Sequence, residues 1–387
     1  KTAYEMLRSL VGSEMWRRDR VMRARQLGIH LGLGTPGPFN AITDVPGVRV
    51  GHSTLNASVD GKQVRTGVTL VQPRAGHARQ QPCFAGCHVL NGNGDATGLE
   101  WIREAGTLTT PLAITNTHSV GVVRDALIAL EREALQDPAV YWCMPVVMET
   151  YDGLLNDIWG QHVGVQQVRE AMACAESGPV AEGAVGGGTG MICHEFKGGI
   201  GTASRRLTAE QGSYTVGALV QANHGKREEL RVDGYPVGRR LGHIPSPFAE
   251  RGTPGMGSIV VILATDAPLL PHQCQRLAQR ASIGIARTGG GTEDSSGDIF
   301  LAFATGNRDL PTADYGRKGL GFSTPLAMLN NDHISPLFSA AAEAVEEAII
   351  NALLAGVPMT SADGVQVPAL SAQVLLETLE LTGWNRS

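Results

Sequence analysis

The stretch that most constrains this chain is residues 255–266, Gly-Met-Gly-Ser-Ile-Val-Val-Ile-Leu-Ala-Thr-Asp, where a glycine-containing loop meets a continuous aliphatic run. Residues 259–263 are apolar at every position, which predicts a strand buried on both faces. The preceding segment, 251–254, contains Gly and Pro and favours neither a helix nor a strand ladder. An irregular loop therefore leads directly into a rigid central strand, and Ser258 stands at the junction.

Two interpretations of the Gly257–Ser258 bond are open. One is an ordinary boundary between a loop and a strand. The other is self-cleavage, in which the Ser258 hydroxyl attacks the carbonyl of Gly257, which no side chain hinders. The new chain would begin at Ser258 and carry a hydroxyl nucleophile and a free α-amine on one residue. An α-amine has a pKa of about 7.7–8.0, close to what a general base needs at neutral pH.

The composition is that of a large globular protein without a basic surface. The chain has 387 residues, of which 42% are hydrophobic, enough for a large core in one or two domains. Its net charge of −5 argues against a nucleic-acid partner. No apolar run approaches the about 20 residues that span a bilayer. We therefore expect a soluble, cytoplasmic protein without a membrane partner. Periplasmic export stays open, because a removed leader would leave no trace before Lys1.

The six cysteines do not form a metal-binding pattern. Cys83 and Cys87, with His88 after them, are the only close pair, and no second pair follows at the spacing of a zinc site. We expect free and mostly buried thiols, which favours a reducing compartment.

Local patterns predict several elements around this strand. Residues 48–52 and 66–71 have strand patterns, and Asp60-Gly61 between them predicts a type I′ hairpin turn. Helical patterns cover residues 1–26, 271–287, 335–356 and 371–381. The basic first segment is expected to pack on its own chain or on a partner subunit, rather than to bind nucleic acid.

Two glycine-rich segments are candidates for ligand-binding loops. Asn91-Gly92-Asn93-Gly94-Asp95 predicts a sharp bend, and lining a site or forming only a turn are equally open. Residues 183–201 are dense in glycine but lack the Gly-x-x-x-x-Gly-Lys-Ser/Thr pattern that opens a helix in phosphate-binding loops. A nucleotide-binding role is therefore not favoured.

Ser119 is a second candidate nucleophile. A predicted strand at 111–115 is followed by Asn-Thr-His-Ser-Val-Gly and a predicted helix at 122–135, the context of a nucleophile elbow. Thr117, however, stands where the Gly-x-Ser-x-Gly pattern has its first glycine, which provides steric clearance. A helix N-terminus with polar loop groups is the favoured interpretation.

Polar side chains follow three further predicted strands. Glu149 and Tyr151 end the apolar run 141–150, where they either meet a substrate amine and an oxyanion or only face solvent. Asn223 ends the strand 214–223, and its amide is suited to donate to an oxyanion. Ser296 and Asp298 open the strand 297–303, and residues two apart project from the same face.

Five motifs, taken in this order, resemble those of the self-processing serine aminopeptidase family, which includes the L-aminopeptidase/D-amidase/D-esterase and the β-peptidyl aminopeptidases. They lie at residues 115–121, 149–153, 221–223, 255–261 and 296–299. Each motif is weak alone, but five in order are specific, and the resemblance extends from about residue 25 to residue 381.

The resemblance implies an α+β fold, a four-layer αββα sandwich of the N-terminal-nucleophile-hydrolase type. It implies autocatalytic cleavage into an α chain, residues 1–257, and a β chain, residues 258–387, which share one sandwich domain. Residues 1–24 would be an N-terminal extension. It further implies a homo-oligomer, commonly a tetramer of αβ units, and no metal or organic cofactor.

Carried over position by position, the resemblance also assigns roles. Ser258 would be the nucleophile, Asn223 would donate to the oxyanion, and Tyr151 would stabilise the tetrahedral intermediate. Ser296 and Asp298 would position the nucleophile's amine. Glu149 would bind the free amino group of the substrate. The chain is thus expected to release N-terminal residues from short peptides, amides or esters through an acyl-enzyme.

Three rival functions remain at this level. An acyltransferase like the ornithine acetyltransferases has a similar fold and cleaves itself, but it uses threonine where this chain has Ser258. A hydrolase of another class would use Ser119. A non-enzymatic protein would use the glycine-rich segments for nucleotide binding or scaffolding.

Overall fold

The computed structural model describes residues 22–134, 142–249, 257–311 and 321–385. The longer strands are β1 (Arg49–Val59), β2 (Lys62–Gln72), β3 (Cys83–Gly92), β5 (Leu112–Asn116), β6 (Val146–Thr150), β9 (Gly199–Arg206), β10 (Thr215–Asn223), β11 (Ser258–Thr265) and β12 (Gly297–Ala304). The two-residue strands are β4 (Thr107–Leu108), β7 (Ile192–Cys193), β8 (Phe196–Lys197), β13 (Met359–Thr360) and β14 (Gln366–Val367).

The α-helices within these residues are mostly short. They are α2 (Leu99–Ala105), α3 (Val120–Ala134), α4 (Val165–Ala173), α5 (Pro271–Gln279), α6 (Ala281–Thr288), α7 (Ser335–Leu354) and α8 (Ala372–Leu381).

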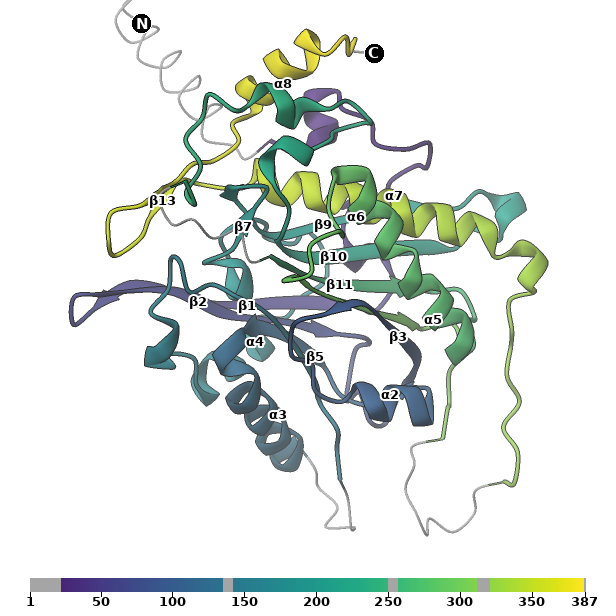
Figure 1. Ribbon diagram of the computed structural model, residues 1–387. Helices are drawn as coiled ribbons and strands as arrows, with labels where there is room; N and C mark the ends of the chain where they lie inside the picture. Colours follow the sequence, from purple (N-terminus) through teal and green to yellow (C-terminus); the bar gives the residue numbers. More distant parts are fainter. Residues whose placement is uncertain (1–21, 135–141, 250–256, 312–320, 386–387) are drawn as a thin grey trace, which may run out of the picture.

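Two sheets stacked face to face form the centre of the molecule (Figure 1). The larger has the order β4-β3-β12-β11-β10-β9, and the smaller has the order β1-β2-β5-β6. Helices α5, α6 and α7 cover the outer face of the larger sheet, and α3 and α4 cover that of the smaller one. One apolar cluster fills the space between the sheets, and two more lie under the two helix layers. The expected four-layer αββα sandwich is confirmed.

The central strand β11 is buried along its whole length, as its aliphatic run predicts. It pairs antiparallel with β10 and parallel with β12, so that Ser258 lies between Asn223 and Gly297. Alternate side chains enter different clusters: Val260 and Ile262 lie between the sheets, while Ile259 and Val261 face the helices. The chain thus fixes Ser258 at one end of a fully buried strand.

Most local predictions agree with the structure. Asp60 and Gly61 join β1 to β2 with φ of 50° and 79°, as a type I′ turn requires. The predicted helix at 271–287 is instead two helices, because the backbone N–H of Arg280 donates to Leu277 three residues back, which ends α5 there.

Only the end of the predicted N-terminal helix lies within the described residues. There the chain forms a 3₁₀ turn, Ala24–Leu27, and Ala24 is fully buried in the core. Among the described residues, the buried core therefore begins at residue 24, the last residue of the predicted extension. The described part of the chain contains no helix that is both long and apolar enough to cross a membrane.

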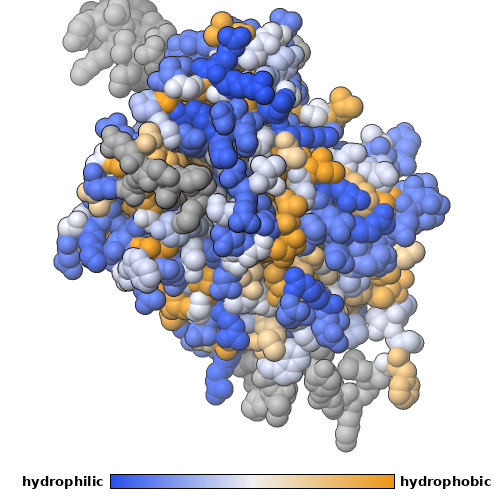
Figure 2. Space-filling model, in the orientation of Figure 1, coloured by the Kyte–Doolittle hydropathy of each residue, from blue (hydrophilic) through white to orange (hydrophobic). Residues whose placement is uncertain are grey.

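The surface contrasts with this apolar interior. Figure 2 shows a face that is largely hydrophilic, with separate apolar strips between the polar side chains. The hydrophobic 42% of the sequence is thus used mainly for the three buried clusters.

A buried ion cluster joins the larger sheet to α7. The Arg205 guanidinium, from β9, contacts Glu343 at 3.0 Å and Glu347 at 2.7 Å. Glu347, which is fully buried, also pairs with Arg25 at 3.0 Å and accepts a hydrogen bond from Asn40. Buried charges are tolerated only with such partners, so each member depends on the others.

We expect Glu347→Ala to lower the free energy of unfolding by about 3–5 kcal/mol, because it leaves the Arg205 charge buried without its full set of partners. Urea denaturation followed by circular dichroism measures the change. Glu100→Ala, in an exposed pair with Arg103, is the control and should change stability little. Equal effects of the two substitutions would contradict the prediction.

Candidate active site

Ser258 is buried at the start of β11, and a neighbouring amide points at its hydroxyl. Nδ2 of Asn223 lies 3.5 Å from Ser258 Oγ and donates to the carbonyl of Tyr151 at 3.0 Å. Oδ1 of Asn223 accepts from the backbone N–H of Ile192 at 2.7 Å. These two bonds fix which end of the amide faces the serine, so a donor is held beside the hydroxyl.

The carbonyl before Ser258 also has a donor. The backbone N–H of Gly297 donates to the carbonyl of Gly257 at 3.3 Å. A Cβ at position 257 would lie 3.0 Å from the Cα of His224, so the residue fits closely against β10. The Gly257–Ser258 bond thus has a polarised carbonyl and a hydroxyl on its two sides. The rest of the predicted loop, 250–256, lies outside the described residues.

Ser296 and Asp298 lie side by side, as their spacing predicts. Ser296 Oγ donates to Asp298 Oδ1 at 2.6 Å, and the N–H of Ile259 also donates to this carboxylate. Burial raises the pKa of Asp298, and the two donors partly offset that rise. Its Oδ2 is buried and has no hydrogen-bond partner among the described residues.

The register separates this pair from the serine hydroxyl. Ser258 pairs with Gly297, and Ile259 pairs with Asp298. Paired residues project from the same face of a sheet, so Asp298 points to the face opposite Ser258 Oγ. The carboxylate therefore lies toward the backbone nitrogens at the start of β11 rather than beside the hydroxyl.

Glu149 lies at the same end of the two sheets. Its carboxylate accepts hydrogen bonds from Thr117 Oγ1 and, at 2.9 Å, from the N–H of Asp95. Burial raises the pKa of Glu149, against the effect of both donors. Gly94 lies between this carboxylate and Gly297: a Cβ at position 94 would be 3.0 Å from Glu149 Oε1 and 3.3 Å from the Cα of Gly297. Gly297 in turn pairs with Ser258, which brings Glu149 close to the candidate nucleophile.

The Asn-Gly bend at 91–95 frames this region. The amide of Asn91 donates to the backbone carbonyls of Glu293, Asp294 and Ser296. Asn93 donates to the carbonyl of Ser295 at 2.6 Å. The bend thus positions both the loop before β12 and Glu149.

Tyr151 contributes to the site through its backbone. Its carbonyl accepts from Asn223, but its side chain is 38% exposed and the hydroxyl lies over Gly153, where any Cβ would overlap it. The structure thus brings Ser258, Asn223, Glu149, Ser296 and Asp298 to one end of the stacked sheets. It does not bring the Tyr151 hydroxyl onto Ser258.

Ser119 lacks the surroundings of a nucleophile. It is buried in the 3₁₀ turn Thr117–Ser119 that precedes α3, and its Oγ has no hydrogen-bond partner among the described residues. The neighbouring His118 ring packs edge-on against the Trp159 ring. Asn116 caps this turn by accepting from the N–H of His118, so the predicted helix N-terminus is confirmed.

Cys193, His194 and His224 are three buried side chains of metal-ligand type, with one ligand atom from each lying within 4.8 Å of the others. Within this group, Cys193 Sγ lies 3.8 Å from His224 Nδ1. The cysteines within the described residues are all free, as expected, and Cys83, Cys87, Cys193 and Cys274 are buried.

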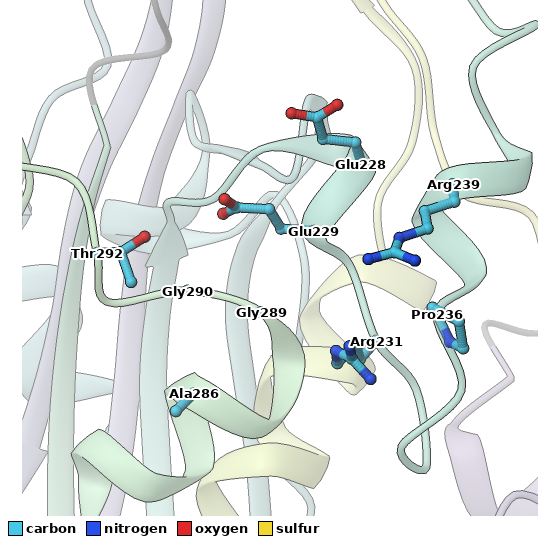
Figure 3. Close-up of a pocket in the computed structure, with 9 residues that line it drawn as sticks. All are labelled: Glu228, Glu229, Arg231, Pro236, Arg239, Ala286, Gly289, Gly290 and Thr292. Atoms are coloured by element: carbon cyan, nitrogen blue, oxygen red, sulfur yellow. The ribbon is translucent and has the colours of Figure 1, made fainter.

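A separate surface pocket lies on the helix side of the larger sheet (Figure 3). Glu228, Glu229, Arg231 and Arg239 give it charges of both signs. Its wall residue Gly290 packs against the ring of His224, the residue that follows Asn223 at the end of β10. The residues that line it do not include Ser258.

Two buried ionisable groups near Asn223 escaped the sequence analysis. Burial raises the pKa of Asp152 to about 7, although Asn156 donates to its carboxylate at 3.0 Å. Burial lowers the pKa of Lys197 to about 7. Asp152 stands inside the motif at 149–153 and Lys197 inside the glycine-dense segment 183–201, but their burial depends on contacts distant in sequence.

Comparison with known proteins agrees with this geometry. The sequence model of Peptidase family S58 matches residues 40–367. The chain belongs to this family. It is therefore a serine-type aminopeptidase, a hydrolase, and the resemblance noted from the five motifs is confirmed.

Two similar sequences are β-peptidyl aminopeptidases named BapA. That of Sphingosinicella microcystinivorans is 46% identical over 367 residues, covering 90% of this chain and 89% of the relative. That of Sphingosinicella xenopeptidilytica is 41% identical over 364 residues, covering 89% of this chain and 88% of the relative.

Solved structures agree on the fold. A β-aminopeptidase of Burkholderia sp. has a TM-score of 0.90 and 70% identity, and the match covers 94% of this chain and 100% of that one. The L-aminopeptidase D-Ala-esterase/amidase of Ochrobactrum anthropi has a TM-score of 0.86 and 41% identity over 93% of this chain and 99% of that one. The latter is described as a variant of the Ntn hydrolase fold, so the expected fold class is confirmed.

We expect Ser119→Ala to leave activity close to that of the wild type, because a buried hydroxyl without a partner is replaced by a methyl group at little cost. Ser258→Ala should abolish turnover. Hydrolysis of amino-acid p-nitroanilides by the two variants, compared at equal protein concentration, measures both effects. The reverse pattern would return Ser119 to the role of nucleophile.

Proposed function

We propose that this aminopeptidase releases N-terminal residues from short peptides, amides and esters through an acyl-enzyme on Ser258, which becomes competent after cleavage at Gly257–Ser258. The observation that carries the proposal is the pairing of Ser258 with Asn223, whose amide is held 3.5 Å from the hydroxyl. An amide donor held beside the nucleophile can reach the oxygen of the carbonyl that Ser258 attacks, where the negative charge of an oxyanion develops.

The cleavage step uses groups already at the junction. Ser258 Oγ attacks the Gly257 carbonyl carbon, the peptide C–N bond breaks, and the nitrogen takes up a proton and becomes the α-amine. The resulting ester is hydrolysed by water, which leaves a carboxylate on Gly257 and a free hydroxyl on Ser258. The N–H of Gly297 donates to this carbonyl, which supports polarisation of the bond that breaks.

In turnover, the freed α-amine of Ser258 accepts the hydroxyl proton as Oγ attacks the carbonyl of the substrate's first residue. Asn223 donates to the developing oxyanion, with Tyr151 as the further stabiliser that the family resemblance implies. The unpartnered Oδ2 of Asp298 is a free acceptor for the α-amine, and Ser296 orients that carboxylate. The leaving amine takes the proton, and water hydrolyses the acyl-enzyme. Added amines or alcohols should compete with water for this intermediate.

Glu149 supplies the selectivity for chain ends. A buried carboxylate near the nucleophile attracts an ammonium group strongly, because water screens the attraction little. A substrate whose free amino group pairs with Glu149 presents its first carbonyl to Ser258. No further residue can precede that first residue, because its amino group must be free to form the pair. Internal peptide bonds offer no such group.

The substrate range that we propose includes β-amino acyl residues. Its support is the 46% and 70% identity to enzymes named as β-peptidyl and β-aminopeptidases. The same relatives favour hydrolysis over an ornithine acetyltransferase-like reaction, for which threonine would replace Ser258. We further propose that αβ units assemble into a homo-oligomer, a tetramer by the family resemblance.

Intact mass spectrometry with N-terminal sequencing should find two fragments, the smaller of which begins Ser-Ile-Val-Val at residue 258. Ser258→Ala should give one uncut chain, because the attacking hydroxyl is gone. A single uncut wild-type chain that nonetheless hydrolyses amino-acyl amides would refute the self-processing mechanism.

Substrate affinity should weaken as the pH falls. Burial raises the pKa of Glu149, so the carboxylate becomes neutral at a higher pH than an exposed glutamate does, and the ammonium loses its partner. The KM of the wild type should therefore rise on the acid side. The Glu149→Gln variant should have a high KM at every pH and should not show this rise on the acid side. A wild-type KM that does not change on the acid side, or a normal KM in Glu149→Gln, would remove Glu149 from amine binding.

A further inference from the structure

Lys197, in the short strand β8, is a buried cation that the mechanism above does not use. Its side chain is fully buried, and Nζ donates to the carbonyls of Met191 at 2.8 Å, Gly198 at 3.0 Å and Gly188 at 3.5 Å. An ammonium has three protons to donate, and three carbonyls receive them. Such burial of a charge is costly without a compensating role.

The most important of these carbonyls belongs to the peptide that holds Asn223. The Met191 carbonyl and the Ile192 N–H are the two ends of one peptide group. Its oxygen accepts from Lys197 at 2.8 Å and from the Gly198 N–H at 2.9 Å. Its N–H donates to Asn223 Oδ1 at 2.7 Å, and the other end of that amide faces Ser258.

These bonds form one directional chain. The ammonium draws electron density toward the Met191 oxygen, which makes the Ile192 N–H a stronger donor to Asn223 Oδ1. That bond in turn polarises the side-chain amide and makes its Nδ2–H a stronger donor. Hydrogen bonds linked in this way strengthen one another by about 10–30% per bond.

Resting on the proposed role of Asn223, we propose that Lys197 is a positioning residue that orients and polarises the oxyanion donor through the Met191–Ile192 peptide. The lysine touches neither substrate nor Ser258. Its charge acts where negative charge develops, so its contribution is greater in the transition state than in the bound substrate. The nearby Asp152 carboxyl and Cys193 thiol are the other ionisable groups that influence this ammonium.

The test is a double-mutant cycle of Lys197→Met and Asn223→Ala in the full-length protein. Methionine keeps the length of the side chain but cannot donate. We expect Lys197→Met to lower kcat about 10–100-fold per matured enzyme, with KM changed less than about 3-fold, and to slow maturation. Adding Lys197→Met to the Asn223→Ala variant should lower kcat little further, because the amide through which Lys197 acts is already absent.

The controls separate positioning from folding. Lys62→Met, at an exposed lysine paired with Asp157, should keep wild-type kinetics. Lys197→Gln, a neutral donor, should recover part of the kcat and serves as the second variant if Lys197→Met folds poorly. Equal fold-losses from Lys197→Met in the wild-type and Asn223→Ala backgrounds, or an unchanged kcat, would overturn the proposal.

The cycle also separates this proposal from the function on which it rests. A fully active Asn223→Ala variant would refute the role of Asn223 as oxyanion donor, and with it the role of Lys197. An impaired Asn223→Ala beside a fully active Lys197→Met would overturn the role of Lys197 alone.

Discussion

The hydrogen-bonded register of the central strand is the constraint on which the rest of the site depends. Ser258 is held between Asn223 and Gly297 because β11 pairs antiparallel with β10 and parallel with β12. The same two ladders place an amide donor on one neighbour and the Ser296–Asp298 pair on the other. A shift of one residue in either ladder would turn those side chains to the wrong face.

Around this register the molecule buries several ionisable side chains. Burial raises the pKa of Glu149, Asp152 and Asp298, and it lowers that of Lys197. Both effects follow from removing water, and both leave fixed groups whose electric fields are weakly screened. A substrate ammonium and a developing oxyanion would meet charges and dipoles that are already oriented.

Sequence reasoning reached the parts of this site that depend on local pattern. The aliphatic run after Ser258, the Asp60-Gly61 turn and the alternation of Ser296 and Asp298 each rest on neighbours in the chain, and the structure agrees with them. The burial of Lys197 depends on distant segments such as the one that contains Pro368, and the direction of the Tyr151 hydroxyl depends on how its side chain packs over Gly153. No spacing rule indicates these two features, because the sequence shows Lys197 only as a charge among glycines.

The strand order of the larger sheet bears on what a cut at Gly257–Ser258 would do to the molecule. Strands β11 and β12, from the proposed small fragment, lie side by side with β3 on one flank and β10 on the other, both from the large fragment. Helix α7, also from the small fragment, packs across β9 and β10. The two fragments therefore share one sheet, in which strands of the small fragment lie between strands of the large fragment. Cleavage would expose a free amine, but the two fragments would stay associated. The processed enzyme would purify as one species, unfold in one transition and exchange its amide protons as one unit.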